Sequence, residues 1–510
     1  MAIASIRVDP AEVVAPVSRR LFGSFVEHMG RAVYTGIYEP GHPTADAAGF
    51  RGDVLELVRE LGASVIRYPG GNFVSGFRWE DSVGPVADRP RRLDVAWHSL
   101  ETNEVGLHEF AAWADTAGVE IMQAVNLGTR GIAEAADLLE YSNHTGGTAL
   151  SEARRANGRD EPFGIRLWCL GNEMDGPWQI GHKTAAEYGR LAAETGRVMK
   201  WIDPTVELVA AGSSNADMPT FGGWERTVLE EAADVVDHIS LHAYYEETDG
   251  DVDSFLASSV GLDRYIAEVA AIVDDVSPAG KTIGISVDEW NVWYQSRFND
   301  IDKQPLFDGD WAEHPRIIED EYSVTDAVVV GSLLCSLLRN SDRVSMANLA
   351  QLVNVIAPIR SEPGGPAWRQ TTFYPFALTS AAASGAVLRA VVDGDTISTA
   401  KYGEVAVLDA AVTATDGELA LFLVNRSTTE GLSLSADLGV ELLSSSAVSI
   451  HAPAGGDRFS SNTQTAPGTV VPVELDSVEL DGTRLTAVLP PLSWSVIRLA
   501  TAPQQKAPIS

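Results

Sequence analysis

Eight consecutive residues decide how this chain folds: Leu167-Trp168-Cys169-Leu170-Gly171-Asn172-Glu173-Met174. An apolar run ends abruptly in a glycine, an amide and a carboxylate. The run is too short to span a membrane and is typical of a buried strand in a parallel sheet. A carboxylate at the C-terminal end of such a strand lies where barrel enzymes keep their catalytic groups. The stretch therefore makes Glu173 a candidate site residue.

A second stretch has the same design: Ile283-Gly284-Ile285-Ser286-Val287-Asp288-Glu289-Trp290. It is again an apolar run that ends in a carboxylate, here followed by a tryptophan. One strand-end glutamate is most often a solvated loop residue. Two of them in the same context indicate an acid and a nucleophile, and we take Glu173 and Glu289 as that pair.

Strand and helix patterns alternate between residues 21 and 351. Strands are predicted at 21–27, 65–68, 121–126, 167–171, 208–211, 238–244, 283–289 and 344–351. Helical spacing is predicted at 50–61, 103–118, 132–141, 184–201, 219–233, 255–273 and 323–338. Eight strands separated by helical segments predict an α/β fold, a closed (β/α)8 TIM barrel. An open doubly wound sheet is the alternative, but no Gly-x-Gly-x-x-Gly follows the first strand.

The helical patterns stop near residue 385, and short apolar strands separated by Gly, Ser, Thr and Pro take over. This pattern predicts a C-terminal antiparallel β-sandwich, jelly-roll-like in type. Residues 1–15 alternate like a lone strand and can join it. We therefore expect a catalytic barrel at 16–384 and an accessory domain made of 1–15 and 385–510. The tail from Ala502 is expected to fray.

The composition limits which classes of binding partner we expect. The 510 residues carry a formal net charge of -34. Phosphate backbones and anionic membranes attract Lys and Arg clusters, so we expect neither nucleic acid nor membrane as a partner. The N-terminus lacks the pattern of a signal peptide, and no apolar run is long enough for a membrane helix, so we expect a cytoplasmic protein. The two cysteines, Cys169 and Cys335, are expected to be buried thiols.

The ends of barrel strands meet at one rim, and the residues expected there are mainly neutral hydrogen-bonding groups. They are Glu27, Arg67, Asn72, Asn126, Asn172, Glu173, His242, Tyr244, Glu289, Asn348 and Gln351, with Trp97, Trp178, Trp290 and Trp293 nearby. No cluster has metal spacing, and there is no phosphate-cradling loop and no Gly-x-Ser-x-Gly elbow. Amides, hydroxyls and indole faces suit an uncharged polyhydroxylated ring, a sugar. Hydrolysis of a glycoside needs two carboxyl groups, roughly 5–5.5 Å apart for retention and about 6.5–9.5 Å for inversion, and strand spacing alone permits either.

Longer motifs carry a family resemblance. They are Gly23-Ser24-Phe25-Val26-Glu27-His28, Arg67-Tyr68-Pro69-Gly70-Gly71-Asn72-Phe73, Trp168 to Trp178, Asp288-Glu289-Trp290-Asn291-Val292-Trp293-Tyr294, and Ala350-Gln351-Leu352-Val353-Asn354. Together they resemble the α-L-arabinofuranosidases of glycoside hydrolase family 51. The resemblance spans the barrel and is weaker over the accessory domain.

The resemblance implies a retaining exo-enzyme that removes terminal arabinofuranose from arabinan, arabinoxylan or arabino-oligosaccharides. It implies Glu173 as the general acid/base and Glu289 as the nucleophile, with Arg67 and His242 orienting Glu289. The substrate-binding candidates are Glu27, Asn72, Asn172, Tyr244 and Gln351, with Trp97 and Trp293 as possible sugar platforms. It further implies no metal and no other cofactor, and a homo-oligomer, commonly a hexamer.

Two rival functions remain at this point. One is an endo-acting glycosidase of the same clan, which a long Trp-lined cleft would favour. The other is a non-catalytic carbohydrate-binding protein that uses the β-domain. One structural condition is strict: adjacent residues of a strand face opposite sides, so Asn172 and Glu173 reach one sugar only if the strand ends near Gly171.

Overall fold

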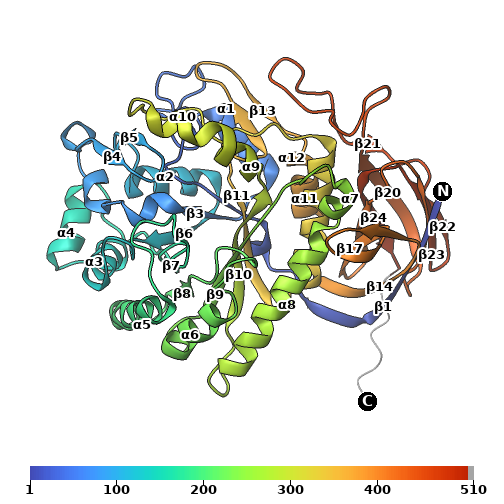
Figure 1. Cartoon of the computed structure of the whole chain (residues 1–510), viewed down its shortest axis with the longest axis horizontal. Coiled ribbons are helices and arrows are strands. Elements are labelled where there is room, and N and C mark those ends of the chain that lie inside the picture. The colour runs from blue at the N-terminus through green and yellow to red at the C-terminus, as the bar shows by residue number, and fades with distance from the viewer. Residues whose placement is uncertain (503–510) are drawn as a thin grey trace.

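The computed structural model describes residues 1–502 and has two units side by side (Figure 1). One is a closed barrel of eight parallel strands with helices around it, and the other is a ten-stranded sheet. The helix α11 (Val324–Arg339) lies between them. The predicted TIM barrel with a β-sandwich is thereby confirmed. Within residues 1–502, every helix is too short or too polar to cross a bilayer.

The barrel closes in the order β10-β11-β2-β3-β6-β7-β8-β9. Its strands are β2 (Gly23–Phe25), β3 (Val65–Tyr68), β6 (Glu120–Val125), β7 (Leu167–Leu170), β8 (Glu207–Ala210), β9 (His238–Tyr245), β10 (Gly284–Val292) and β11 (Val344–Ala350). The first strand differs from its prediction, because Arg19–Phe22 forms a 3-10 turn, η1. In that turn Arg20 forms ion pairs with Glu120 and Glu207, at 2.6 and 2.8 Å, at the N-terminal ends of β6 and β8.

The outer helices are α1 (Gly52–Leu61), α2 (Leu107–Ala117), α3 (Ile132–Asn143), α4 (Ala149–Ala156), α5 (Ala185–Ile202), α6 (Gly223–Ala232), α7 (Val252–Leu256), α8 (Ser258–Val276), α11 and α12 (Phe373–Ala382). Thr184 caps α5 by accepting the backbone N–H of Glu187, as its capping-box pattern predicts. The single helix predicted at 255–273 is instead two helices, α7 and α8, that meet at Ala257. The sequence pattern missed α12, which packs between α11 and α1 as the eighth barrel helix.

Two insertions lie on loops that follow barrel strands. The hairpin of β4 (Arg92–Asp94) and β5 (Ser99–Glu101) follows β3 and carries Trp97 in its turn. A short helical segment follows β10 and consists of α9 (Gln295–Arg297), η5 (Phe298–Asp302) and α10 (Lys303–Asp308). The two insertions approach each other, since the rings of Trp97 and Phe298 lie 6.3 Å apart. The loops above the barrel therefore meet over its rim.

The accessory sheet has the order β21-β20-β24-β18-β17-β14-β1-β19-β23-β22. Its strands are β1 (Ala2–Pro16), β14 (Ala386–Gly394), β17 (Leu408–Thr415), β18 (Glu418–Asn425), β19 (Leu432–Asp437), β20 (Leu442–Ile450), β21 (Val473–Glu474), β22 (Glu479–Asp481), β23 (Arg484–Leu489) and β24 (Ser493–Thr501). One pair departs from the antiparallel prediction: β1 and β19 run parallel. The position of β1 supports the domain division that we propose, 1–15 with 385–510. Of the tail that is expected to fray from Ala502, residues 503–510 lie outside the described residues.

Strand β18 is buried on both faces. Leu419, Leu421 and Leu423 enter the core of the accessory sheet itself. Their neighbours Ala420, Phe422 and Val424 belong to the large core shared with the barrel helices. This alternation explains why the strand is apolar throughout, although it belongs to an antiparallel sheet. Both cysteines are buried as predicted.

Polar contacts also join the two units. Asp409 of β17 accepts hydrogen bonds from Ser259 of α8 and Ser332 of α11, at 2.8 and 2.5 Å. Its carboxylate also pairs with Arg339 at 2.5 Å and with Arg426 at 2.6 Å. Although burial alone would raise the pKa of Asp409, the two arginines outweigh burial and hold that pKa at about 2. The sheet is therefore fixed to the barrel by a satisfied charged cluster as well as by packing.

Candidate active site

The backbone turns over the rim directly after β7. The strand ends at Leu170, Gly171 has φ +85°, and Glu173 has φ +42°. Both values lie in the left-handed region, which glycine adopts readily and other residues rarely. The turn brings Asn172 and Glu173 to the same side. The strand thus ends near Gly171, as it must if both residues are to reach one sugar.

Glu289 stands on β10 with both carboxylate oxygens engaged. Arg67 of β3 donates from Nη1 to Oε1 at 2.6 Å, and the hydroxyl of Tyr244 donates to Oε2 at 2.7 Å. The side chain of Glu289 is only 7% exposed. Two donors on two oxygens fix the carboxylate plane, which a nucleophile needs if one oxygen is to face a sugar carbon.

Glu173 faces Glu289 across the barrel mouth. Its Oε1 lies 2.8 Å from Nδ1 of His242, and its Oε2 accepts the indole N–H of Trp178 at 2.5 Å. Burial raises the pKa of Glu173, and the charge of Glu289 adds to that rise, although His242 and Trp178 oppose it. A carboxyl group with a raised pKa can hold a proton near neutral pH, as a general acid must.

Arg67 connects three parts of the site. While Nη1 holds Glu289, Nη2 donates to Oδ1 of Asn172 at 2.7 Å, and Nε lies 3.6 Å from Asp288. Its guanidinium group stacks 4.9 Å above the ring of Phe25. Burial alone would lower the pKa of Arg67, but the carboxylates outweigh burial and raise it, so the group stays charged. The amide of Asn172 is thereby oriented, with its Nδ2 left 3.4 Å from Asn72 and Gln179.

His242 of β9 lies between the two candidate catalytic carboxylates. Its Nδ1 is 2.8 Å from Glu173 and 3.5 Å from Glu289, and its Nε2 is 3.1 Å from Asp288. Sequence reasoning expected His242 to orient Glu289, whereas its shorter contact is with Glu173. Burial alone would lower the pKa of His242, but the surrounding carboxylates raise it well above its ordinary value.

Glu27 lies in the loop after β2 and is also buried. Its Oε1 accepts the backbone N–H of Phe73 and the indole N–H of Trp97, both at 2.8 Å. Burial raises the pKa of Glu27 to about 8 against these two donors, with the charges of Glu289 and Asp94 adding to the rise. The backbone N–H of Glu27 donates to Oε1 of Gln351 at 3.1 Å, which links two predicted sugar-binding residues.

The remaining predicted residues divide into two groups. Tyr244 and Trp293 are half-buried at the mouth, with their rings 5.1 Å apart in a T-shaped arrangement. Asn72 begins the η2 turn (Asn72–Ser75) and lies 3.4 Å from Nδ2 of Asn172. Asn126 instead closes its own loop, where it binds Phe77 O and the N–H of Gly128. Asn348 is buried inside the barrel, 3.2 Å from the sulfur of Met122. These last two do not reach the site.

Two contributors were missed as site residues. Trp178 was noted only as a nearby aromatic, yet its N–H contacts Glu173, and the motif that contains both could have indicated this. Asp288 was quoted only as part of a motif, yet it is 2% exposed and contacts both Arg67 and His242. Its position next to Glu289 argued against it, because adjacent residues of a regular strand face opposite sides.

The two carboxylates lie close together. One oxygen of Glu173, one oxygen of Glu289 and a ring nitrogen of His242 lie within 4.8 Å of one another. Such a group has the donor types of a metal site, which sequence spacing did not show because the three residues come from three strands. Here, however, each carboxylate already meets N–H or O–H donors, from Arg67, Tyr244 and Trp178. The donor set fits a proton-transfer site better than a cation site.

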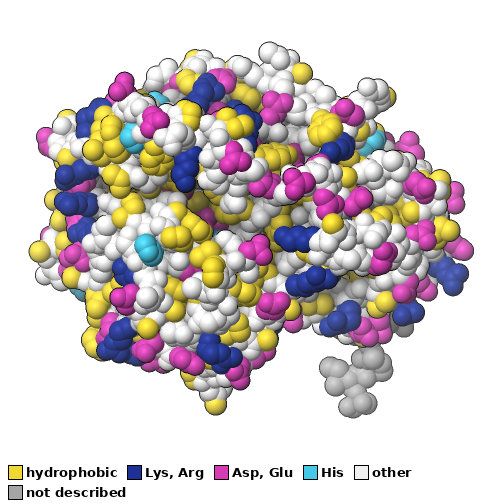
Figure 2. All heavy atoms as spheres, viewed as in Figure 1, with side chains coloured by type: hydrophobic (Ala, Val, Ile, Leu, Met, Phe, Trp, Pro, Cys, Tyr) yellow, Lys and Arg dark blue, Asp and Glu magenta, His cyan; other side chains and the backbone are white. Residues whose placement is uncertain are grey.

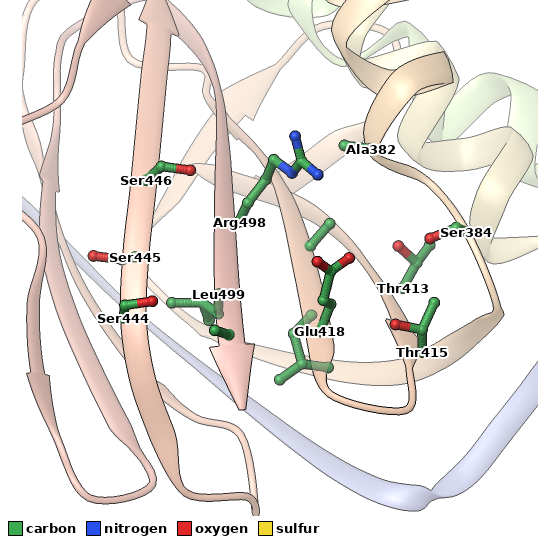
Figure 3. A pocket seen from close by; sticks show the side chains of 13 residues that line it. Ala382, Ser384, Thr413, Thr415, Glu418, Ser444, Ser445, Ser446, Arg498 and Leu499 are labelled. Atoms are coloured by element: carbon green, nitrogen blue, oxygen red, sulfur yellow. The ribbon is translucent and has the colours of Figure 1, made fainter. Parts of the chain in front are cut away.

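Two hollows differ in character. Figure 2 shows one in the face over the barrel, rimmed largely by hydrophobic side chains. Another, of about 220 Å³, lies on the accessory sheet beside the end of α12. Figure 3 shows Arg498 and Glu418 there, with Ser444, Ser446, Thr413 and Thr415 around them. The residues that line the second hollow include no aromatic ring on which a sugar could stack.

Comparisons with known proteins agree over the whole chain. Two family models match: "Alpha-L-arabinofuranosidase 1 domain" over residues 57–260 and "Alpha-L-arabinofuranosidase C-terminal domain" over residues 288–493. An intracellular exo-α-(1→5)-L-arabinofuranosidase of Streptomyces lividans is 59% identical, over 98% of this chain and 76% of its own length. An exo-α-(1→6)-L-arabinofuranosidase of Bifidobacterium longum is 54% identical, over 96% of both.

Solved structures give the same result. A family 51 α-L-arabinofuranosidase from Bifidobacterium longum superimposes with a TM-score of 0.92 at 46% identity, over 98% of this chain and 100% of that one. One from Thermotoga petrophila has a TM-score of 0.86 at 33% identity, over 97% and 99%. A Paenibacillus polymyxa xyloglucanase, at 14% identity and a TM-score of 0.60, shares the fold alone.

Proposed function

This chain belongs to the family 51 α-L-arabinofuranosidases, and we propose that it hydrolyses terminal non-reducing α-L-arabinofuranosyl residues by double displacement, with retention of configuration. The observation that carries the mechanism is the separation of the two carboxylates. Oxygens of Glu173 and Glu289 lie within 4.8 Å of each other. Retaining glycosidases hold their carboxyl groups roughly 5–5.5 Å apart, whereas inverting ones need about 6.5–9.5 Å to fit a water molecule. This spacing supports retention over inversion.

In the first step, Glu289 attacks the anomeric carbon while Glu173 protonates the departing oxygen. The hydrogen bonds from Arg67 and Tyr244 hold Glu289 in place for attack. Glu173 suits the acid role because burial raises its pKa. In the second step, Glu173 takes a proton from water, which attacks the glycosyl-enzyme and releases Glu289.

The sugar is held by groups on the rim. Asn172, with its amide oriented by Arg67, is the candidate for the 2-hydroxyl, a contact that strengthens in the transition state. Glu27, Asn72, Tyr244 and Gln351 supply further hydrogen-bonding groups to the furanose. Trp97 and Trp293 bound the ring as aromatic walls. The loops that carry them meet over the mouth, which supports exo-action over the endo-acting alternative.

The substrate and setting follow from the relatives. Arabinan, arabinoxylan and their oligosaccharides are the proposed substrates. The relatives are named for 1→5 and 1→6 linkages, so release of arabinose from α-1,5- and α-1,6-linked disaccharides compares the two directly. We infer a cytoplasmic location because several relatives are named intracellular. We propose a homohexamer, for which light scattering should give a molar mass about six times the 54.5 kDa of one chain.

Two variants test the mechanism. Glu289→Ala should retain less than about 0.1% of wild-type activity on an aryl α-L-arabinofuranoside, because the nucleophile is lost. Glu173→Ala should accumulate glycosyl-enzyme from an activated aryl substrate, with azide restoring turnover and giving the α-azide, because azide inverts the β-linked glycosyl-enzyme. Proton NMR of the first-formed arabinose should show the α-anomer. Undiminished turnover by Glu289→Ala, or a β-anomer as first product, would refute double displacement.

A further inference from the structure

Strand β10 presents two adjacent carboxylates to the barrel interior, although neighbours in a regular strand face opposite ways. The reason is an extra residue in the ladder. Against β9, Ser286 pairs with Ser240 and Glu289 with His242, so three steps on β10 match two on β9. Against β11, Val287 pairs with Ala347 and Trp290 with Leu349, with the same mismatch. Such a bulge re-aims a side chain and is common beside active sites.

We infer that Asp288 is a positioning residue that acts on the acid/base Glu173 through His242. Its carboxylate accepts the Nε2–H of His242, so that Nδ1 turns to Oε1 of Glu173 and the Glu173–His242 pair holds the one proton that catalysis transfers. The inference rests on the proposed function, in which Glu173 is the acid/base.

The partners of Asp288 support this assignment. Its Oδ2 meets Nε of Arg67 at 3.6 Å and the thiol of Cys169 at 3.9 Å. Its Oδ1 is buried and has no well-aligned donor among residues 1–502, and the nitrogen that faces it is Nε2 of His242, 3.1 Å away. A buried carboxylate oxygen requires a donor, so the nitrogen facing it carries the hydrogen. The proton of the pair then lies between Nδ1 and Oε1 of Glu173, which are 2.8 Å apart, on Glu173 when the imidazole is neutral and on Nδ1 when it is charged.

The charges around His242 come from three elements. They are Glu173 and Asp175 after β7, Asp288 and Glu289 on β10, and Arg67 on β3, with His242 itself on β9. Burial would raise the pKa of Asp288, but Arg67 and His242 outweigh burial and lower it, so the group is anionic. An anion on the far side of the imidazole increases the proton affinity of the Glu173–His242 pair.

The proton balances over both steps. In the first, the anomeric C–O bond breaks, Glu289 forms its bond to carbon, and the proton of the pair moves to the departing oxygen. The carboxylate of Glu173 then faces the lone pair of His242 Nδ1, while the N–H of His242 Nε2 still points to Asp288. This arrangement is repulsive, so the pair is a strong base for the second step. There water adds to carbon, Glu289 leaves, and the proton of water restores the pair.

The test is Asp288→Asn with two aryl α-L-arabinofuranosides. Phenol needs a proton to leave, whereas 2,4-dinitrophenol does not. We expect kcat/KM for the phenyl substrate to fall about 10- to 100-fold, with the basic limb of its pH profile about one unit lower. The dinitrophenyl substrate should stay within about threefold of wild type, since it bypasses acid catalysis. Asp320→Asn is the matched control, because Asp320 is a buried aspartate that accepts the N–H of Tyr294, and its profiles should match wild type.

Each other outcome has a defined meaning. A basic limb that coincides with wild type overturns the inference. Equal slowing of both substrates also overturns it, because Asp288 would then act on Glu289 through Arg67. If Asp288→Asn does not fold, Asp288→Ser, which also removes the charge, carries the same test with the same expected limb. Failure of the wild-type enzyme to cleave either arabinofuranoside would instead refute the proposed function.

Discussion

A single methyl group added at Gly71 tests whether the backbone after β3 sets the position of Glu27. A Cβ atom at Gly71 would lie 2.3 Å from Oε2 of Glu27 and 2.7 and 2.8 Å from its Cδ and Oε1. Non-bonded carbon contacts are relaxed near 3.5 Å, so the carboxylate must retreat by roughly 1 Å. The variant Gly71→Ala therefore displaces a sugar-binding group without changing its chemistry.

The displacement has a calculable cost. The hydrogen bonds from Phe73 N–H and Trp97 Nε1–H to Oε1 are both 2.8 Å long, and a shift of about 1 Å would break them. The hydroxyl of the sugar would lose the same carboxylate. Leaving a buried hydrogen-bonding group unpaired costs about 1–3 kcal/mol, which corresponds to roughly a 5- to 150-fold loss in kcat/KM.

The assay is kcat/KM on 4-nitrophenyl α-L-arabinofuranoside, measured for Gly71→Ala in two backgrounds. In the wild-type background, kcat/KM should fall by the factor given in the preceding paragraph. In the Glu27→Ala background the same substitution should cost little, because the atoms it meets are gone. Gly41→Ala is the control, since nothing lies within 4 Å of a Cβ there. An equal loss in both backgrounds would refute the reasoning, because the methyl group would then act on something other than Glu27.

Three further predictions concern stability and pH. Asp409→Asn should lower the free energy of unfolding by about 3–5 kcal/mol in urea, since Arg339 and Arg426 lose their buried partner. Burial would raise the pKa of Asp409, but these arginines hold it at about 2, below an unfolded value near 3.9, so this stability is present above about pH 4 and is lost as the pH falls toward 2. Melting temperatures of variant and wild type should therefore converge in acid, and a constant gap would contradict this. The change Gly331→Ala is normally favourable in a helix, but here the new Cβ would lie 2.0 Å from Cδ1 of Trp494. It should therefore lower the free energy of unfolding by about 1–3 kcal/mol, and a higher melting temperature than wild type would count against this. Trp178→Phe removes a donor that favours ionised Glu173, so the basic limb of kcat/KM should move to higher pH, opposite to Asp288→Asn, and an unmoved limb would show that the hydrogen bond does not act on the acid.

The barrel was predictable because its signals are local. The eight strand predictions overlap the observed strands, and seven predicted helices overlap observed ones. Helix α12 was missed because its sequence, Phe373-Tyr374-Pro375-Phe376 onward, packs on α11, α1 and β24 and so lacks a single apolar stripe. The parallel pairing of β1 with β19 could not be predicted either, because residue patterns show that a strand exists but not which strand it pairs with.

The residues of the candidate site also divide into those that local sequence predicts and those that depend on tertiary contacts. Glu173 and Glu289 follow from strand ends, and the bend at Gly171 could be deduced from strand geometry alone. Asp288 could not, because its direction depends on a bulge that forms only when β10 pairs with β9 and β11. The contact of Trp97 with Glu27 depends on a hairpin whose path over the barrel is set by long-range packing. Local pattern thus predicts which residues reach the rim, and tertiary register decides which of them touch.

The position of β1 has a consequence for how the chain is made. Ala4 pairs with Gly394 on one side and Leu434 on the other, so β1 waits for partners that are synthesised several hundred residues later. The barrel strands are complete by Ala350, so the barrel can close while the accessory sheet still lacks its middle. A deletion through Pro16 would not trim an edge but would divide that sheet and expose two unpaired strands, β14 and β19. Vectorial synthesis therefore completes the two units in order, and residues 385–502 without the N-terminal strand would be an open sheet prone to association.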